Sequence, residues 1–282
     1  MKIVKFLGGL GNQMFQYAFY KALLEKERYV FADLSDFKTY NLHNGFELEN
    51  IFDLTVKKPK KIYLEVLKSR SEKRIYRKIK SLLGLKKSYV QETENFVYTS
   101  QFFNLTTSNY FWGYWQNENY FKAIDSKIRK DFEFKLPLNN VNTEMLHKIS
   151  YTNSISLHIR RGDYVKDPLL GNICNLQYYN AAIAYIQSKI NDPIFYVFSD
   201  DIDWCIANLN ADNLNFINWN KNHESYIDMQ LMSHCKHNII ANSSFSWWGA
   251  WLNSNKDKIV IAPKKWINDS ELTLALPNWI KL

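Results

Sequence analysis

The alternation of apolar runs and helical segments in the second half of the chain places the tightest limit on its fold. Short runs rich in β-branched and aromatic residues predict strands at Ser154–Ile159, Ile194–Phe198, Leu214–Ile217, Asn238–Ala241 and Lys258–Ala262. The segments between them predict helices at Gln177–Ile190, Asp201–Ala207, Glu224–Cys235 and Ser246–Leu252. Strands that are apolar throughout and separated by helices are typical of βαβ units around a buried parallel sheet.

The first half begins in the same way and then becomes irregular. Lys2–Leu7 and Tyr29–Ala32 are expected strands, and Gln13–Glu27 is the expected helix between them. An aromatic segment, Tyr110–Phe121, shows no clear periodicity. Turn-forming residues near 138–152 mark a boundary, so we expect one domain at residues 1–145 and another at 146–282. The length of 282 residues allows two Rossmann-like domains with a cleft between them.

The net charge of +8 comes from one block of the chain. Residues 57–87 carry 13 Lys or Arg and two acids, whereas the remainder carries 23 basic and 26 acidic residues. An isolated block of this kind argues against a general nucleic-acid-binding surface. Apolar residues recur within it at near-helical spacing and predict one basic amphipathic helix that ends at Gly84. We favour a solvated helix with one core-facing stripe; the alternative is peripheral contact with an anionic membrane.

Neither a membrane span nor a disulfide framework is indicated. No run approaches the roughly 20 apolar residues that cross a bilayer, and the N-terminal apolar run is brief and broken by glycines. The three cysteines have no metal-binding spacing and are expected to be reduced thiols. We expect a cytoplasmic protein.

A glycine-rich turn, Gly8–Gln13, follows the first expected strand. Glycines at such a turn let backbone N–H groups approach a phosphate at a helix N-terminus. Met14 stands where a dinucleotide-binding fingerprint needs its third glycine. From these residues alone, a structural turn and a ligand-binding loop are equally supported.

Two adjacent arginines follow the first strand of the second half. Strand alternation places Ser156, His158 and Arg160 on one face, so Arg161 points the other way. Arginine forks at the carboxyl end of a parallel strand suit a pyrophosphate. The alternative is an internal Arg–Asp network in which Asp163 orients one arginine. We assign Arg160 to a phosphate and expect Arg161 to pair within the protein.

An acidic segment, Asp200–Asp203, follows the next strand. Its carboxylates can accept from a ribose or from the edge of guanine. Asp201 and Asp203 also form a D-x-D pair that could hold a divalent cation. The simplest account is N-capping of the following helix, and we rank the metal site last.

The segment Asn242–Trp251 follows a strand and opens a helix. Small hydroxyl residues at a positive helix end form an anion cradle. Its tryptophans, Trp247, Trp248 and Trp251, are expected to be packing anchors, and the first and last of them share a helix face.

Together these segments resemble glycosyltransferase family 11, the α-1,2-fucosyltransferases. The resemblance covers the chain in order: GGLGNQMFQYA, GYWQNENYF, HIRRGDY, FSDD and NSSFSWWGAWL. It implies an α/β fold of the GT-B type with two Rossmann-like domains and GDP-fucose held mainly by the second. It also implies inverting transfer of fucose to the 2-hydroxyl of a galactose-type residue, in an O-antigen or other surface polysaccharide, without metal or other cofactor.

The resemblance also assigns residues. Arg160 would bind the β-phosphate, His158 and Asp200 the guanosine, and Ser244, Phe245 and Ser246 the pyrophosphate and base. The turn containing Gly9, Gly11 and Asn12 would close the donor site from the other domain. The central motif supplies three candidate acceptor contacts, Tyr114, Trp115 and Gln116. Asp163 is the carboxylate nearest the site in sequence, and it is kept as a catalytic candidate although orienting an arginine suits it better.

Two rival functions remain at the level of sequence. A metal-dependent GT-A glycosyltransferase would use Asp201 and Asp203. A non-catalytic carbohydrate-binding protein would explain the nine Trp and 18 Tyr residues, but such proteins rarely need paired arginines beside a glycine-rich helix start.

Overall fold

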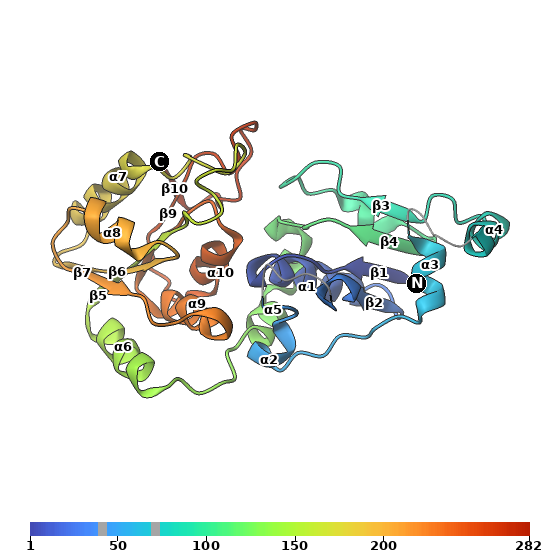
Figure 1. Cartoon of the computed structure of the whole chain (residues 1–282), viewed down its shortest axis with the longest axis horizontal. Coiled ribbons are helices and arrows are strands. Elements are labelled where there is room, and N and C mark those ends of the chain that lie inside the picture. The colour runs from blue at the N-terminus through green and yellow to red at the C-terminus, as the bar shows by residue number, and fades with distance from the viewer. Residues whose placement is uncertain (39–43, 69–73) are drawn as a thin grey trace. The chain divides into compact units, whose positions relative to one another are not determined.

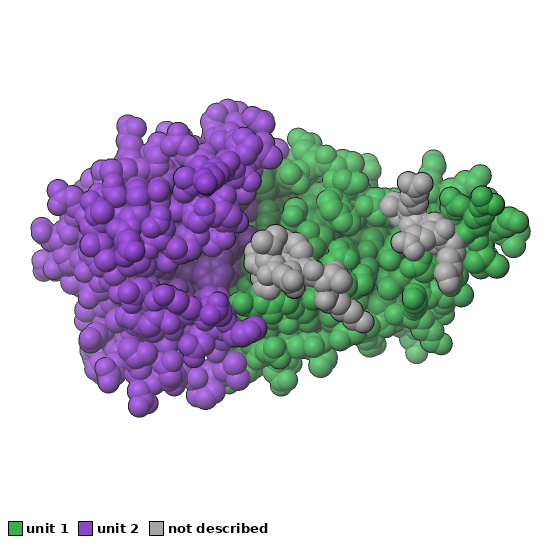
Figure 2. Space-filling view, viewed as in Figure 1, with its two compact units in different colours: residues 1–135 green, residues 136–282 purple. Residues whose placement is uncertain are grey.

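The structure, a computed structural model, describes residues 1–38, 44–68 and 74–282. The chain divides into two compact units, residues 1–135 and 136–282 (Figure 2). The boundary lies ten residues before the expected one because residues 140–151 form a helix that packs on the second unit. Asn142 in that helix donates to Asn220 of the same unit at 2.8 Å.

Unit 1 is built around a four-stranded parallel sheet with the strand order β2-β1-β4-β3 (Figure 1). Its strands are β1 (Lys2–Lys5), β2 (Val30–Asp33), β3 (Tyr89–Gln91) and β4 (Asn109–Trp112). Its α-helices are α1 (Leu10–Leu24), α2 (Leu48–Phe52), α3 (Lys61–Leu67), α4 (Arg74–Leu82) and α5 (Asp125–Asp131). Short 3₁₀ helices occur at η1 (Ser35–Lys38), η2 (Ser100–Asn104), η3 (Glu118–Tyr120) and η4 (Lys122–Ile124).

Unit 2 contains a six-stranded parallel sheet with the strand order β10-β9-β8-β5-β6-β7 (Figure 1). Its strands are β5 (Asn153–Ile159), β6 (Pro193–Ser199), β7 (Leu214–Ile217), β8 (His237–Ile239), β9 (Val260–Ala262) and β10 (Ile280–Lys281). Its helices are α6 (Asn140–Tyr151), α7 (Leu176–Gln187), α8 (Ile202–Asn208), the short η5 (Asn222–Glu224), α9 (Tyr226–His234) and α10 (Ser244–Leu252). Two α/β units around parallel sheets confirm the expected fold class, and all five strands expected in the second half are present.

Strand β5 shows why this half of the sequence forms a doubly covered sheet. Ile155, Leu157 and Ile159 point into an apolar cluster formed with helices α7 and α8. The alternate residues face the other layer: Ser154 Oγ accepts from Lys236 N, and Ser156 Oγ accepts from Asn238 Nδ2. The alternation expected for residues 154–160 is therefore confirmed up to the end of the strand.

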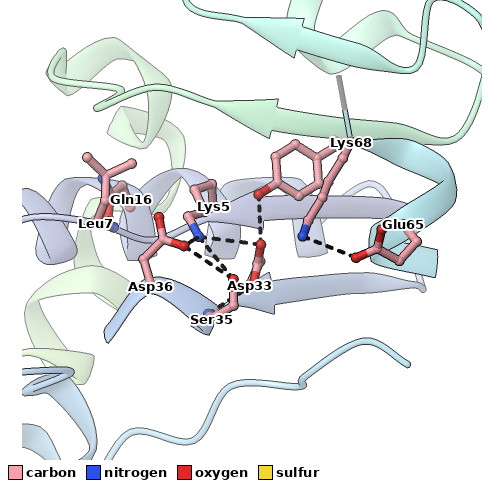
Figure 3. Close-up of polar contacts among 9 residues, drawn as sticks. Lys5, Leu7, Gln16, Asp33, Ser35, Asp36, Glu65 and Lys68 are labelled. Carbon is pink, nitrogen blue, oxygen red and sulfur yellow. Dashed lines mark hydrogen bonds and ion pairs between the residues drawn. The ribbon is translucent and has the colours of Figure 1, made fainter. Parts of the chain in front are cut away.

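A buried polar network stabilises the carboxyl end of the sheet in unit 1. Lys5 ends β1 and lies between Asp33, at 3.5 Å, and Asp36, at 2.6 Å (Figure 3). Tyr110 on β4 donates to Asp33 at 2.7 Å. Burial by itself raises the pKa of Asp33, but the Lys5 ammonium and hydrogen bonds from Tyr110 and Ser35 outweigh it, so the pKa of Asp33 is lowered. Three strands of the sheet are thus joined by side chains as well as by the backbone.

Two expectations for unit 1 were wrong. The aromatic segment that begins at Tyr110 is not irregular at its start, because residues 109–112 form β4 beside β1. The basic block is not one straight helix, because α3 ends at Leu67 and Lys80 Nζ donates to the carbonyl oxygen of Lys68 at 2.6 Å. Residues 12 positions apart in one helix would be separated by roughly 18 Å. Residues 69–73, which the predicted helix included, lie outside the described residues.

Candidate active site

The order of the strands in unit 2 locates its ligand-binding edge. Read from β7, the order matches the 3-2-1-4-5-6 arrangement of dinucleotide-binding domains, and the order in which the strands are added reverses between β5 and β8. In such sheets ligands bind outside the carboxyl ends of the two strands at this reversal. Residues 160–163 follow β5, and residues 240–244 follow β8 and lead into α10. Two of the candidate segments therefore meet at one sheet edge.

Arg160 is held at this edge by two carboxylates. Its Nη2 lies 2.7 Å from Asp163 Oδ1, and its Nη1 lies 2.9 Å from Asp200 Oδ2. The guanidinium also lies over the ring of Tyr164, 5.5 Å from its centroid. A guanidinium has five N–H donors, so these two pairs fix its plane and leave donors for a ligand. The expectation that Asp163 orients an arginine is confirmed.

Arg161 pairs within the protein, as expected. Its Nε lies 3.0 Å from Asp201 Oδ2, and its guanidinium stacks on Trp204 of α8 at 4.0 Å from the ring centroid. Asp201 also accepts from Trp204 N at 3.2 Å and so caps the N-terminus of α8. Both oxygens of Asp201 are therefore engaged, and the capping role expected of this residue is confirmed. Among the described residues, no group of three or more His, Cys, Asp or Glu side chains is placed to hold a metal ion.

Asp200 holds the loop after β5 in place. Its Oδ1 accepts from the backbone N–H of Arg161 at 2.8 Å, and its Oδ2 pairs with Arg160. A Cβ at Gly162 would lie 2.6 Å from Asp200 Oδ2, so a larger residue there would force this carboxylate to shift. Both oxygens of Asp200 thus bind the arginine loop, and its expected contact with the guanosine stays a prediction.

His158 is a side chain at this edge with an unused polar atom. It is 6% exposed, and its buried Nδ1 has no hydrogen-bond partner among the described residues. Burial, followed by the nearby charge of Arg160, lowers the pKa of His158 to about 3. The imidazole is therefore neutral at physiological pH. Its ring centroid lies 5.8 Å from that of Phe245 at the start of α10.

The first turn of α10 offers a ligand its backbone N–H groups more than its side-chain hydroxyl groups. Ser243 is the N-cap residue and its side chain makes no capping hydrogen bond. Ser244 and Phe245 are half-buried, whereas Ser246 is fully buried and its Oγ donates weakly to the carbonyl oxygens of Ala241 and Ser243. The expected side-chain contact of Ser246 with the donor is thus not supported, since its hydroxyl points into the turn. The first backbone N–H groups of a helix remain suited to an anion.

The aromatic residues of α10 form part of the core. Trp247, Trp248 and Trp251 are buried, and the rings of the first and last are stacked with centroids 6.3 Å apart. This confirms that they anchor the helix. The three cysteines are free thiols, as expected.

The glycine-rich turn of unit 1 is fixed by glutamine and asparagine side chains. Gly8 has φ of +80°, and Gly9 is the N-cap of α1. Gln13, fully buried, donates to the carbonyl oxygens of Gly8 and Gly45 at 2.9 and 2.8 Å. Gln116 Nε2 donates to Asn12 Oδ1 at 2.7 Å. Gly11 lies buried in the first turn of the helix. The motif that contains Gln116 therefore lies beside this turn.

The acceptor role expected of Trp115 is wrong. Its side chain is completely buried and stacks on Phe19 with ring centroids 4.2 Å apart. A buried carboxylate fixes the backbone here, since Glu92 Oε2 accepts from Tyr114 N at 2.7 Å and from Trp115 N at 3.1 Å. Tyr114 and Gln116 are half-buried and remain candidate acceptor contacts.

Asp228 is a titratable residue that the sequence analysis did not single out. It lies in the first turn of α9 and accepts from Asn220 Nδ2 at 2.8 Å. Burial raises its pKa to about 7. Its sequence position did not distinguish it, because acidic residues are common in the first turn of a helix.

The described residues contain no helix with the length and apolar character needed to cross a membrane. Two α/β units, one of which presents an oriented arginine and a neutral histidine at its switch point, provide the kind of edge at which open α/β sheets bind ligands. A profile of the family described as "Glycosyl transferase family 11" matches residues 2–282. The chain belongs to this family, and it is a glycosyltransferase.

Similar proteins include two from Escherichia coli. An "Alpha-1,2-colitosyltransferase" is 36% identical, over 99% of this chain and 98% of its own. An "O-antigen biosynthesis glycosyltransferase WbnK" is also 36% identical, over 98% of both chains. Among solved structures, the α-1,6-fucosyltransferase NodZ soaked with GDP-fucose is 13% identical, with a TM-score of 0.47, over 89% of this chain and 92% of its own.

Proposed function

We propose that the protein transfers L-fucose from GDP-fucose to the 2-hydroxyl of a galactose-type residue in a surface glycan. The observation that carries this proposal is the joining of His158, Arg160 and Phe245 at the switch point of unit 2 in a chain of this family. The 1,2-linkage is supported by the name of the colitosyltransferase relative and by the motifs of residues 1–282. The relative named for O-antigen biosynthesis supports a polysaccharide acceptor.

The donor would lie across the carboxyl ends of β5 and β8. In this proposal Arg160 binds the β-phosphate, while the first turn of α10, with Ser244 and Phe245, offers N–H groups to the pyrophosphate. The unpartnered Nδ1 of His158 would take a hydrogen bond from the guanosine. The turn with Gly9, Gly11 and Asn12 is proposed as a second donor contact, and Tyr114 with Gln116 as acceptor contacts.

The side chains at the carboxyl ends of β5 and β8 carry no net positive charge, and this limits how a phosphate could be recognised there. Arg160 and Arg161 are opposed by Asp163, Asp200 and Asp201. Phosphate recognition would therefore depend on directed N–H donors and not on a diffuse positive field. Donors fixed in advance cost no reorganisation when charge appears, which is the condition for strong transition-state stabilisation.

The chemical step is displacement at C1 of fucose. The acceptor 2-hydroxyl oxygen forms the new bond to C1 on the face opposite the phosphate, the C1–O bond to GDP breaks, and the hydroxyl proton passes to a base. Negative charge grows on the leaving β-phosphate, where Arg160 is placed to stabilise it. Asp163 holds Arg160 and is better suited to positioning than to accepting the proton.

The test is a donor and acceptor screen with purified protein. GDP-fucose and galactose-terminated oligosaccharides would be incubated together, and the product mass and linkage determined by mass spectrometry. GDP should also raise the melting temperature more than UDP at equal concentration, through ligand linkage. Equal stabilisation by both nucleotides, together with no fucosylated product, would contradict the proposal.

A second donor deserves a parallel assay because one relative is named a colitosyltransferase. Colitose is fucose without its 3-hydroxyl, so both GDP-sugars present the same pyrophosphate to Arg160. A site that hydrogen-bonds the 3-hydroxyl would reject GDP-colitose strongly, because a buried polar group would then be left unpaired. Faster turnover of GDP-colitose would reassign the donor while keeping the α-1,2-transferase function.

The proposal includes a cytoplasmic location with peripheral contact to an anionic membrane through residues 57–87. A lipid-carried acceptor would be met at such a surface. The excess of 13 basic over two acidic residues in this block supports the contact.

A further inference from the structure

Helix α4 has an unusual surface for a helix of a folded domain. None of its residues, Arg74–Leu82, is buried. Ile75 is 61% exposed, Leu82 is 87% exposed, and Leu83, directly after the helix, is 61% exposed. Residues at positions i, i+4, i+7 and i+8 lie on one side of a helix, so Ile75, Ile79, Leu82 and Leu83 form one apolar edge. None of these four residues, 75, 79, 82 and 83, is buried against the part of unit 1 that the structure describes.

Cations occupy much of the rest of the surface of the helix. Helix α4 contains Arg74, Arg77, Lys78 and Lys80 and no acidic residue. Lys78 shares a surface hollow with Ile75, Ile79 and Leu82, so charge and apolar atoms meet on one face. Among the described residues, Arg74, Arg77 and Lys78 are in no ion pair. The charges of these three residues are therefore not neutralised within the described part of the chain.

One cation is used differently and attaches the helix to the domain. Lys80 Nζ donates to the carbonyl oxygens of Lys68 and Leu67, at 2.6 and 3.4 Å, at the end of α3. Burial lowers the pKa of Lys80. In Figure 1 the helix lies beside α3 at the margin of unit 1, away from α1. The anchoring lysine lies on the side opposite Ile75 and Leu82, which leaves the apolar edge exposed.

We infer that α4 and its apolar edge form a docking surface for an anionic lipid bilayer, with Ile75, Leu82 and Leu83 inserted among the lipids and Arg74, Arg77 and Lys78 at the headgroups. A bilayer interface satisfies both features at once, because it offers apolar depth beneath a layer of phosphates. A nucleic acid would use the cations but would leave Leu82 exposed. A second copy of this chain would bring like charges together.

Helix α4 would be the surface through which residues 57–87 make the membrane contact of the proposed function. That the acceptor is carried on lipid rests on the proposed function. The docking itself is measured without substrates. Full-length protein would be sedimented with phosphatidylcholine vesicles, with or without phosphatidylglycerol. We expect binding to the anionic vesicles to exceed that to neutral vesicles by on the order of tenfold or more, and to fall as salt is raised.

Three double variants separate the contributions. Arg77→Glu with Lys78→Glu should reduce binding to anionic vesicles by on the order of tenfold or more. Ile75→Ser with Leu82→Ser should reduce it several-fold with the charge unchanged. Lys256→Glu with Lys264→Glu makes the same charge change at exposed positions of unit 2 and should have little effect. Melting temperatures should match wild type, since all the substituted side chains are exposed.

Each other outcome overturns the inference. Equal binding to neutral and anionic vesicles would contradict the contact of Arg74, Arg77 and Lys78 with anionic headgroups. If the serine variant binds anionic vesicles as well as wild type does, apolar insertion is contradicted and the surface is a polyanion site. Stronger binding to a single-stranded oligonucleotide than to vesicles would then identify it as a site for nucleic acid. Transfer to a soluble galactoside is assayed on the same proteins and should be unchanged. If wild type docks but transfers no fucose, the proposed function fails and the docking surface stands.

Discussion

The rings of His158 and Phe245 lie with centroids 5.8 Å apart, and this contact joins the end of β5 to the first turn of α10. The two residues belong to motifs that are far apart in the sequence. Their contact makes one site of two strand ends, with Arg160 two residues beyond His158. A neutral imidazole with a vacant acceptor or donor nitrogen is well suited to a nucleoside hydroxyl or amine.

The two arginines should respond differently to lysine. Arg160→Lys keeps the charge but loses the planar fork that Asp163 and Asp200 orient, so turnover should fall by on the order of 100-fold with the fold retained. Arg161→Lys loses stacking on Trp204 and should mainly lower the melting temperature. Both would be compared by GDP release and thermal melting. A folded but inactive Arg161→Lys beside an active Arg160→Lys would reverse the assignment.

Asp163→Asn tests whether this carboxylate positions Arg160 or accepts the proton. Asp163 is 64% exposed and pairs with Arg160, so its loss should lower kcat by about tenfold, the size of a charged hydrogen bond, with little change in melting temperature. The pH profile of kcat should keep its shape. Disappearance of the acidic limb of that profile would instead make Asp163 the general base.

Metal removal should leave the reaction largely intact. In the proposed site the pyrophosphate is met by Arg160 and the N–H groups of α10, and Asp201 is engaged by Arg161 and Trp204 N. We therefore expect excess EDTA to leave the initial rate of GDP release nearly unchanged. Loss of activity in EDTA, with recovery on adding Mn²⁺, would support the D-x-D metal site.

Asp228 should make stability depend on pH. Burial raises its pKa from 3.8 to about 7, so between these values the folded chain keeps a proton that the unfolded chain has lost. Its stabilising contribution is complete below pH 3.8 and is lost as pH rises through 7. Asp228→Asn should therefore gain in melting temperature relative to wild type between pH 5 and pH 8. Asp257→Asn, at an exposed position, is the control and should show no such trend.

Substitutions at Trp115 and at its neighbour Tyr114 should have different effects, the first on stability and the second on acceptor binding. Trp115→Ala opens a cavity beside Phe19 and should cost about 3–5 kcal/mol of folding free energy. Tyr114→Ala should leave the melting temperature nearly unchanged and raise the KM for the acceptor several-fold. Thermal melts and acceptor titrations of the two variants give the comparison. A normal acceptor KM in Tyr114→Ala would remove this residue from the acceptor site.

The sheet of unit 2 was predictable because each strand carries its own pattern. Ile155, Leu157 and Ile159 alternate with polar residues, and the arginines follow directly, so the strand, its faces and its functional end are all local properties. That Arg161 pairs within the protein followed from the same alternation, but its partner, Asp201, was not predicted. Strand β4 was missed because its aromatic residues resemble those of the irregular segment that continues beyond it.

Properties that depend on distant partners could not be predicted in this way. Trp115 stands in the motif that was expected to bind the acceptor, yet whether it faces a sugar or Phe19 is decided by the packing of α1. The raised pKa of Asp228 depends on burial beside Asn220, which comes from a different loop. The break between α3 and α4 was hidden because the apolar spacing on either side continues with nearly the same period.

Gly162 affects the orientation of Arg160 indirectly, through the carboxylate of Asp200. The space above its Cα is filled by the Asp200 carboxylate that aligns Arg160, so even one added methyl group would press on the support and not on the substrate. Substitution there should turn the guanidinium while leaving every proposed donor contact chemically intact. The absence of a side chain at Gly162 thus sets the orientation of the Arg160 guanidinium. A substitution at this position would change the reaction rate without changing which donor is bound.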